Sequence, residues 1–430
     1  MMKTILFPPR NTWESLCKRP EIDKSGLEDI VKNIISRVKL EGDKALYEFS
    51  EKLDGAVPEN LKISASEISG SEKLVPENLK TAIKIAKDNI EKFHLAQLTK
   101  EQVVETSTGV KCWRKNVPIE KVGLYIPGGT APLFSTVLML AIPAKIAGCK
   151  EIIMCTPPDR AGKVNPLILY AAHLAGVTNV YRIGGAQAIA AMAFGAESVP
   201  KVNKIFGPGN QYVTKAKELI QLDGIPIDMP AGPSEVLVIA DETANPAFIA
   251  ADLLSQAEHG TDSQVILLTN NTEIISLVKT EIDKQVKLLS RKEIALKALG
   301  NSISIQFSSP DDCIDFSNLY APEHLIIVTS DPTPLAEKVI NAGSVFLGKY
   351  SCESAGDYAT GTNHTLPTNG YARNFSGVST ESFMKKISFQ EVSEEGLKNL
   401  GPVIEMMAEA ELLNGHKNAV TIRLKTLQNV

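Results

Sequence analysis

Residues 122–148 read VGLYIPGGTAPLFSTVLMLAIPAKIAG, in which a β-rich run passes through a glycine-rich turn into a helical segment. The same order returns in VYRIGGAQAIAAMAFG (180–195) and KIFGPGNQYVTKAKELI (204–220). This alternation predicts a parallel, doubly wound α/β sheet, whose ligands sit at the carboxyl ends of its strands. Helix N-termini after glycine turns suit a pyrophosphate, but the full G-x-G-x-x-G fingerprint is missing from all three turns. Glycines that serve only tight turns are the alternative interpretation.

A second α/β series begins at EVLVIAD (235–241). Further short strands are expected in SQVILLT, SISIQF, EHLIIVTS and GSVFLG, which start at residues 263, 302, 323 and 343. The stretch 349–377 has no periodicity and is rich in Gly, Thr, Asn and Tyr, so we predict a long loop, which is typical of functional or disordered segments. The chain before residue 110 and the end of the chain read as mostly helical.

The composition indicates a soluble globular protein. The 430 residues, of which 43% are hydrophobic, suggest roughly two or three domains with ordinary cores. Charges of both signs are interspersed and the net charge is -5, so no basic face is expected to bind nucleic acid or an anionic membrane. The six cysteines are scattered without a Cys-x-x-Cys pair, which indicates reduced thiols and a cytoplasmic location.

The stretch ADLLSQAEHGTDSQ (251–264) is the first candidate for a metal site. A helix capped by Asn245 is expected from about residue 246 to 259. Gln256 and His259 are three residues apart and would share one face of its last turn. A Gln-x-x-His pair is less specific than the His-Glu-x-x-His motif of zinc peptidases, and a helix that simply ends in polar residues is the alternative.

More polar candidates occur in loops and at element ends of the second half. Oxygen and nitrogen donors suited to zinc are offered there by Gln256, His259, Asp357 and His416. Glu323 and His324 set a carboxylate beside an imidazole. Because neighbours in a strand point to opposite faces, both would serve one pocket only if the preceding Ala321–Pro322 turn is irregular. A polar start to a strand is the alternative interpretation.

Taken in order, these stretches resemble the histidinol dehydrogenase family along essentially the whole chain. The matching segments are long, and together they are far more specific than any single motif. They are GLYIPGGTAPLFSTVLMLA, GGAQAIAA, FGPGNQYV, DMPAGPSEVLVIAD, LLSQAEHGTDSQ, YAPEHL, GSVFLG, SAGDYATGTNHTLPT and LNGH.

The resemblance implies an NAD-dependent, four-electron oxidation of L-histidinol through L-histidinal to L-histidine, the last step of histidine biosynthesis. It implies one zinc ion per subunit that orients the substrate and is held by Gln256, His259, Asp357 and His416. These four residues and His324 would contact substrate together with Ser234, His364 and Glu411. NAD would contact Tyr125, Gln187 and Asn210. His324 would be the base, and Glu323 would activate the water that hydrates the aldehyde.

The resemblance also implies two Rossmann-like α/β domains, one of them discontinuous, in an intertwined homodimer. The first domain would comprise 24–124 and 236–378 and carry most of the zinc site, while 125–235 would be an inserted NAD-contacting domain. Residues 1–23 would form an N-terminal arm. A helical C-terminal arm, 379–430, would complete the partner's active site.

Three other functions remain to be separated from this one. A related zinc- and NAD-dependent dehydrogenase would act on another small polar alcohol, such as sulfopropanediol. A zinc hydrolase would need a metal-bound water and no NAD, and a catalytically silent interaction protein would need neither. A cysteine nucleophile is the rival route for aldehyde oxidation. Cys149 and Cys155 have no neighbouring histidine in the sequence and are expected to be structural.

Overall fold

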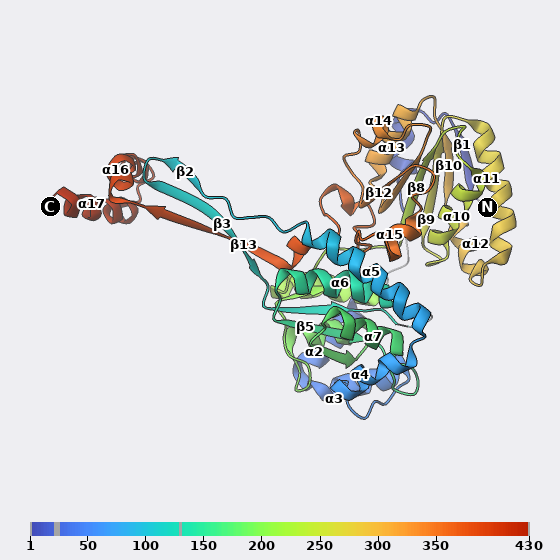
Figure 1. Ribbon diagram of the computed structural model, residues 1–430, viewed down its shortest axis with the longest axis horizontal. Coiled ribbons are helices and arrows are strands. Elements are labelled where there is room, and N and C mark those ends of the chain that lie inside the picture. The colour runs from blue at the N-terminus through green and yellow to red at the C-terminus, as the bar shows by residue number, and fades with distance from the viewer. Residues whose placement is uncertain (1, 21–25, 129–130, 429–430) are drawn as a thin grey trace. The chain divides into compact units, whose positions relative to one another are not determined.

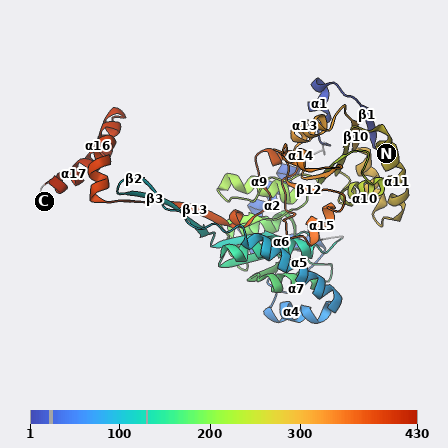
Figure 2. The same ribbon diagram turned by 45° about the horizontal axis from the view of Figure 1, so that its top comes forward.

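The computed structural model describes residues 2–20, 26–128 and 131–428, and the chain divides into two compact units (Figures 1 and 2). The first unit comprises Met1–Gln97 and Ile119–Phe383, and the second comprises Leu98–Pro118 and Met384–Val430. The first unit contains two parallel sheets, and the second contains one antiparallel sheet. None of the helices in the described ranges combines the length and apolar character that a membrane span requires.

A four-stranded parallel sheet occupies one half of the first unit, with the strand order β6-β5-β4-β7. Its strands are β4 (Lys121–Tyr125), β5 (Glu151–Thr156), β6 (Asn179–Arg182) and β7 (Lys204–Phe206). One face packs against α2 (Leu27–Glu41), α3 (Asp43–Phe49), α8 (Gly185–Phe194) and α9 (Gln211–Ile220). Helix α6 (Phe134–Ala147) contacts β4 and β5, and it also packs against α5 (Glu77–Leu95) and α7 (Pro166–Ala175).

The local sequence explains why these elements start and stop where they do. The Asn165 side chain accepts a hydrogen bond from the backbone of Leu167, and Pro166 begins α7 at a position where its missing N–H is not needed. Gly176 then ends α7 in the left-handed region. The strands between such helices are almost wholly buried, as expected for a parallel sheet that is covered on both faces.

A six-stranded sheet, also parallel, occupies the other half with the order β1-β10-β9-β8-β11-β12. Its strands are β1 (Lys3–Leu6), β8 (Glu235–Ala240), β9 (Gln264–Thr269), β10 (Ile303–Gln306), β11 (His324–Val328) and β12 (Ser344–Leu347). One face is covered by α10 (Pro246–Ala257), α11 (Thr272–Gln285) and α12 (Lys292–Gly300). The other face is covered by α1 (Trp13–Leu16), α13 (Pro310–Tyr320) and α14 (Thr333–Ala336). Figure 1 shows this layering around the labelled strands.

Short helices complete the first unit. They are η1 (Arg10–Thr12), η2 (Ser50–Asp54), α4 (Ala65–Gly70), η3 (Ser71–Leu74), η4 (Gln221–Asp223), η5 (Val286–Leu288), α15 (Glu353–Tyr358), η6 (Tyr371–Arg373) and η7 (Thr380–Phe383). Two of the predictions need correction here. The stretch 349–377 is not wholly loop, because it contains α15. Helix α10 ends at Ala257, so His259 lies in the turn that follows rather than on the helix.

The second unit is built on an antiparallel sheet with the order β13-β3-β2. It comprises β2 (Val104–Ser107), β3 (Val110–Pro118), β13 (Met384–Val392) and two helices that pack together, α16 (Glu394–Ala410) and α17 (Asn414–Gln428). The ring centroids of Trp113 and Phe389 stack 5.4 Å apart across the pair β3-β13.

Two segments belong to different parts of the fold than the sequence suggested. Residues 98–118 were expected in the first α/β domain, but β2 and β3 lie in the second unit because β3 pairs with β13. The first residues were expected to form an arm, whereas β1 is the edge strand of the six-stranded sheet of the same chain, since Lys3 pairs with Ile303. One side of β1 is thereby hydrogen-bonded to β10 within the first unit.

Candidate active site and metal centre

The catalytic candidates gather at the amino ends of two adjacent strands of the six-stranded sheet. Glu235 is the first residue of β8 and His324 is the first residue of β11, and these strands pair in parallel. Helix α10 follows β8 and packs antiparallel on the sheet, which returns Gln256 to the same end. Parallel sheets usually bind ligands at the carboxyl ends of their strands. This site lies at the amino ends instead, and α10 contributes to it because the helix runs back along the sheet.

Gln256 is almost fully buried and holds the centre of this cluster. Its Nε2 lies 3.2 Å from the backbone oxygen of Glu235, 3.4 Å from Oε2 of Glu323 and 3.0 Å from Nδ1 of His324. Its Oε1 is buried and has no hydrogen-bond partner among the described residues. The amide nitrogen therefore fixes the side chain, while its oxygen is left for a donor or a cation.

The turn before β11 brings Glu323 and His324 into one pocket. Ala321 adopts a left-handed conformation with φ 55° and ψ 67°, so the backbone is irregular at the position where the sequence required it. Glu323 precedes the first residue of the strand, and its Oε2 lies 3.7 Å from Nδ1 of His324. A carboxylate and an imidazole that would lie on opposite faces of a regular strand are thereby neighbours.

Acidic side chains from α15 complete the cluster. Ligand atoms of His259, Glu353 and Asp357 all lie within 4.8 Å of one another, a spacing that suits a metal ion. Oδ1 of Asp357 is 3.4 Å from Nε2 of His324. Sequence reasoning missed Glu353, although a signal was present, because residues four apart on a helix share a face and Glu353 precedes Asp357 by four.

The pKa values in the cluster reflect crowded carboxyl groups around one imidazole. Burial raises the pKa of Glu323 to about 8 and that of Glu353 to about 8. Burial alone would lower the pKa of His324, but the Glu323 and Glu353 carboxylates next to it raise it to about 10. Burial alone would raise the pKa of Asp357. The hydrogen bond and the charge of His324 nevertheless lower it below its ordinary value. The cluster therefore stabilises added positive charge.

The donors present fit a zinc ion. Four buried side-chain atoms have no hydrogen bond of normal geometry among the described residues: Gln256 Oε1, His324 Nε2, Glu353 Oε2 and Asp357 Oδ1. Two of them, His324 Nε2 and Asp357 Oδ1, face each other at 3.4 Å. Buried polar atoms without partners are costly, and such a group at one place indicates an ion or a polar ligand. His259 is exposed on one side, yet desolvation by its surroundings lowers its pKa and favours the neutral, ligating form. Oxygen and imidazole donors in this number are typical of zinc.

The other residues expected to contact substrate lie in different places. Half-buried Ser234 lines a cavity of about 570 Å³ together with Asn210 and His259. His364 Nδ1 lies 2.9 Å from the backbone oxygen of Asp357, and its Nε2 lies 3.1 Å from the hydroxyl of Thr136 on α6.

Two predicted site residues belong to the second unit. Glu411 directly follows α16 and His416 lies in the first turn of α17, and both side chains are exposed in this chain.

The three residues expected to contact NAD lie at the ends of the four-stranded sheet. The hydroxyl of buried Tyr125 accepts a hydrogen bond from the backbone of Gly185 at 3.0 Å. Gln187 is buried in α8, where its Nε2 donates to Asp54 at 3.4 Å and its Oε1 lacks a partner among the described residues. Asn210 is exposed and caps α9 by accepting from two backbone N–H groups.

The glycine-rich turns have a structural role, and a cavity adjoins several of them. A Cβ at Gly207, whose φ is +123°, would clash with the backbone oxygen of Tyr125, so tight βα packing alone requires glycine there. A cavity of about 1160 Å³ lies beside the turns that follow β4, β5 and β6, where its lining includes Gly128, Pro157 and Arg182. The turn after β4 is only partly described, because residues 129–130 fall outside the described residues.

Neither candidate cysteine has the surroundings of a nucleophile. Burial raises the pKa of the Cys149 thiol to about 12 and raises that of Cys155 still further. Because the thiolate is the reactive form, both residues are inert at neutral pH.

The chain is similar to known proteins along nearly its whole length. The family model for histidinol dehydrogenase matches residues 17–424. Histidinol dehydrogenase of Bacteroides thetaiotaomicron is 58% identical over 428 residues, covering 100% of both chains, and that of Aliivibrio fischeri is 52% identical, covering 99% of this chain and 97% of the relative. The crystal structure of histidinol dehydrogenase from Elizabethkingia anophelis superposes with a TM-score of 0.97 at 56% identity and covers 99% of each chain.

A match of this extent leaves little of the chain unaccounted for, since the family model spans both units and every stretch that carries a catalytic candidate. The chain therefore belongs to the histidinol dehydrogenase family, the oxidoreductases of the final step of histidine biosynthesis.

Proposed function

We propose that this protein carries out the NAD-dependent, four-electron oxidation of L-histidinol to L-histidine through L-histidinal. One observation supports the proposal most strongly. Oxygen atoms of Gln256, Glu353 and Asp357 that could bind a metal ion lie together beside Glu323 and His324. When bound, zinc would orient the imidazole and amino nitrogens of the substrate, and NAD would accept the hydrides.

The metal would be held by Gln256, His259 and Asp357 of one subunit and by His416 of the partner subunit. The first three residues offer an amide oxygen, an imidazole and a carboxylate at one end of the six-stranded sheet. Glu353 adds a buried carboxyl group next to them. The substrate pocket would also use Ser234 and His364 of the first subunit. Glu411 of the partner subunit would complete it.

His324 is the proposed base for both oxidations. Its Nδ1 lies 3.2 Å from the backbone oxygen of Glu235, and its Nε2 lies 3.4 Å from Oδ1 of Asp357. A cation held by the surrounding ligands would offset the carboxylates that raise the pKa of His324, so that Nε2 would lose its proton and could act as a base. From there it takes the proton of the substrate alcohol in the first step. It takes a proton of the hydrated aldehyde in the second.

Glu323 is the proposed activator of water. Its carboxylate is fixed by the backbone N–H of Glu235 at 2.8 Å, which leaves its remaining acceptor positions for a water molecule beside the aldehyde carbon. Burial raises its pKa to about 8, so its ionised form is a stronger base than an ordinary carboxylate.

NAD would contact Tyr125, Gln187 and Asn210 in a Rossmann-like domain of about residues 125–235. The strand order β6-β5-β4-β7 supports this assignment, since half of a dinucleotide-binding fold has the same order. The side chain of Arg160 in the adjoining cavity also supports it, because a guanidinium suits phosphate groups.

We further propose a cytoplasmic homodimer with intertwined C-terminal arms, in which residues 236–378 contribute most of the zinc site. The C-terminal arm, 379–430, would complete the site of the partner subunit. The exposure of Glu411 and His416 in a single chain supports such a role, because both groups are free to meet another subunit.

An assay of NADH formation tests the proposal. The zinc-loaded protein should reduce NAD with L-histidinol, and it should lose turnover after exhaustive chelation with metal removal verified by elemental analysis. Full turnover of verified metal-free protein would overturn the role of zinc. Faster reduction with sulfopropanediol would identify the related dehydrogenase, and hydrolysis without NAD would identify a hydrolase.

A further inference from the structure

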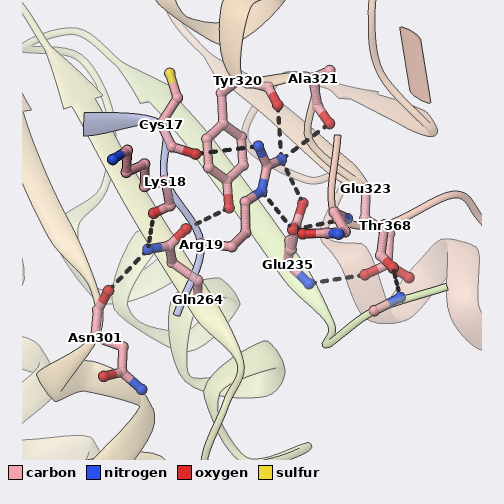
Figure 3. Close-up of polar contacts among 12 residues, drawn as sticks. Cys17, Lys18, Arg19, Glu235, Gln264, Asn301, Tyr320, Ala321, Glu323 and Thr368 are labelled. Carbon is pink, nitrogen blue, oxygen red and sulfur yellow. Dashed lines mark hydrogen bonds and ion pairs between the residues drawn. The ribbon is translucent and has the colours of Figure 1, made fainter. Parts of the chain in front are cut away.

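Arg19 lies behind the active site and is held by several partners at once (Figure 3). Its Nε and Nη2 pair with the two carboxylate oxygens of Glu235 at 2.9 and 3.0 Å. Nη2 also donates to the backbone oxygen of Tyr320 at 2.7 Å, and the guanidinium lies 3.6 Å from the centroid of the Tyr320 ring. Such a bidentate, stacked arrangement is specific to arginine, because lysine offers a point charge without the planar fork.

Glu235 connects this guanidinium to the catalytic pair. Its side chain is buried and faces Arg19, whereas its backbone faces the active site. The backbone N–H donates to Oε2 of Glu323 at 2.8 Å. The backbone oxygen lies 3.2 Å from Nδ1 of His324 and 3.2 Å from Nε2 of Gln256. A single residue thus positions three side chains through its main chain and is itself positioned through its carboxylate.

Arg19 also supports the strained turn that aims Glu323. Ala321 has a positive φ of 55°, a conformation that a residue with a Cβ rarely adopts. The guanidinium donates to the carbonyl of Tyr320 immediately before this residue, and it lies 3.5 Å from the carbonyl of Ala321 itself. The Arg19 side chain therefore contacts both structures that position Glu323. One is the turn at Ala321, and the other is Glu235, whose backbone N–H holds the Glu323 carboxylate.

We infer that Arg19 is a positioning residue for the catalytic pair, acting through Glu235 and the turn at Ala321 and without touching substrate. The inference rests on the proposed role of Glu323 as water activator. Without Arg19, the buried carboxylate of Glu235 keeps the backbone N–H of Asn369 but loses its guanidinium, and a buried charge without a counter-ion must move or take a proton. Either change shifts the N–H that holds Glu323.

The two half-reactions should respond differently to this shift. His324 also faces the backbone oxygen of Glu235 through its Nδ1, but it keeps contacts with Gln256 and Asp357, at 3.0 and 3.4 Å, that Arg19 does not touch. Glu323 depends on the Glu235 N–H and on the Ala321 turn. Loss of Arg19 should therefore impair hydration and oxidation of the aldehyde more than the first hydride transfer, and free histidinal should escape.

The test is the number of NADH molecules formed per histidinol consumed by zinc-loaded Arg19→Met, with released histidinal trapped by semicarbazide. The wild-type protein should give two. Arg19→Met should give clearly fewer than two and should lose about 10- to 100-fold in kcat, the usual effect of removing a supporting contact. Arg19→Lys, which keeps the charge, should give an intermediate ratio and provides the measurement if Arg19→Met does not fold.

Two further variants make the outcome decisive. Arg10→Met is the matched control, because Arg10 anchors the same N-terminal segment through an exposed ion pair with Asp315 and should keep the ratio at two. A purely structural role for Arg19 would lower the active fraction and leave the ratio at two. If the ratio falls in Glu323→Gln but stays at two in both Arg19 variants, the inference about Arg19 is wrong and the proposed role of Glu323 stands. A ratio of two in Glu323→Gln overturns the proposed role of that carboxylate, and the inference with it.

Discussion

The carboxylate of Glu323 and the imidazole of His324 are consecutive in the chain and still lie 3.7 Å apart, between Oε2 and Nδ1, in one buried pocket. A regular strand would separate them onto opposite faces. The positive φ of Ala321 and the placement of Glu323 just before β11 remove that constraint. The proposed water activator and the proposed base are thereby neighbours on a single turn.

Replacing Glu323 by Gln should separate the two half-reactions. The variant keeps the shape of the side chain and loses the group that activates water, so oxidation of supplied histidinal should fall by about 10²- to 10⁴-fold. The first hydride transfer from histidinol should fall much less, whereas His324→Ala should damage both steps. Single-turnover measurements of each half-reaction check this. Equal losses for Glu323→Gln would assign that residue another role.

Replacing Glu353 by Gln should weaken metal retention, because its buried carboxyl group lies with His259 and Asp357 around the candidate metal position. We expect a loss of about 10- to 100-fold in zinc affinity or turnover. Zinc content after dialysis and the rate with L-histidinol are the measurements. Glu258→Gln is the control, since Glu258 neighbours His259 in sequence and is absent from the cluster. Unchanged zinc content and unchanged turnover would remove Glu353 from the site.

Mixed dimers test whether the active site is shared between subunits. His324→Ala and His416→Ala subunits should each be inactive alone, and co-refolding them should restore activity. In the hybrid dimer one site combines both lesions, and the other combines an intact His324 with an intact His416 of the partner subunit. Activity should approach one working site per hybrid. Hybrids that form and stay inactive would show that the C-terminal helices serve their own chain.

Asp54 should make stability depend on pH. Burial raises the pKa of this half-buried carboxyl to about 6, above its ordinary value of 3.8. The folded state then binds the proton more tightly than the unfolded state, so the free energy of unfolding should fall as pH rises from about 4 to 6.

Asp54→Asn removes that titration and retains an acceptor for the backbone of Gly184. It should raise the free energy of unfolding at pH 8 by about 1 kcal/mol, after allowance for partial solvent exposure, with little change at pH 4. Urea unfolding at both pH values is the measurement. A variant whose stability follows the wild-type pH profile would exclude Asp54 as the titrating group.

Much of the α/β architecture was predictable because its signals are local. Parallel strands that are covered on both faces read as continuous apolar runs, and β8 and β9 are of this kind. The cap that begins α10 was equally visible, since the Asn245 side chain accepts from the backbone of Ala247 and Pro246 follows it.

The parts that escaped prediction depend on tertiary contacts. Helix α15 has six residues and no apolar periodicity, and buried Glu353 and Gly356 hold it in place, so Glu353 was overlooked. Strand β1 has four mostly exposed residues, and pairing with a distant strand defines it. The Arg19–Glu235 pair joins positions 216 residues apart, a separation that neither residue type nor spacing reveals.

Pairing of β1 with β10 also imposes an order of events during synthesis. Lys3 leaves the ribosome first, but its partner Ile303 follows only after most of the chain has been made. At ordinary elongation rates the N-terminal segment waits roughly 15 to 60 seconds for its neighbour. During that interval a strand with unpaired N–H and C=O groups is available to other chains, and Arg19 has no Glu235–Tyr320 platform to close on. If Arg19 positions the catalytic pair as proposed, catalytic competence is acquired late, and extensions fused before Met2, which is buried, should delay or block it.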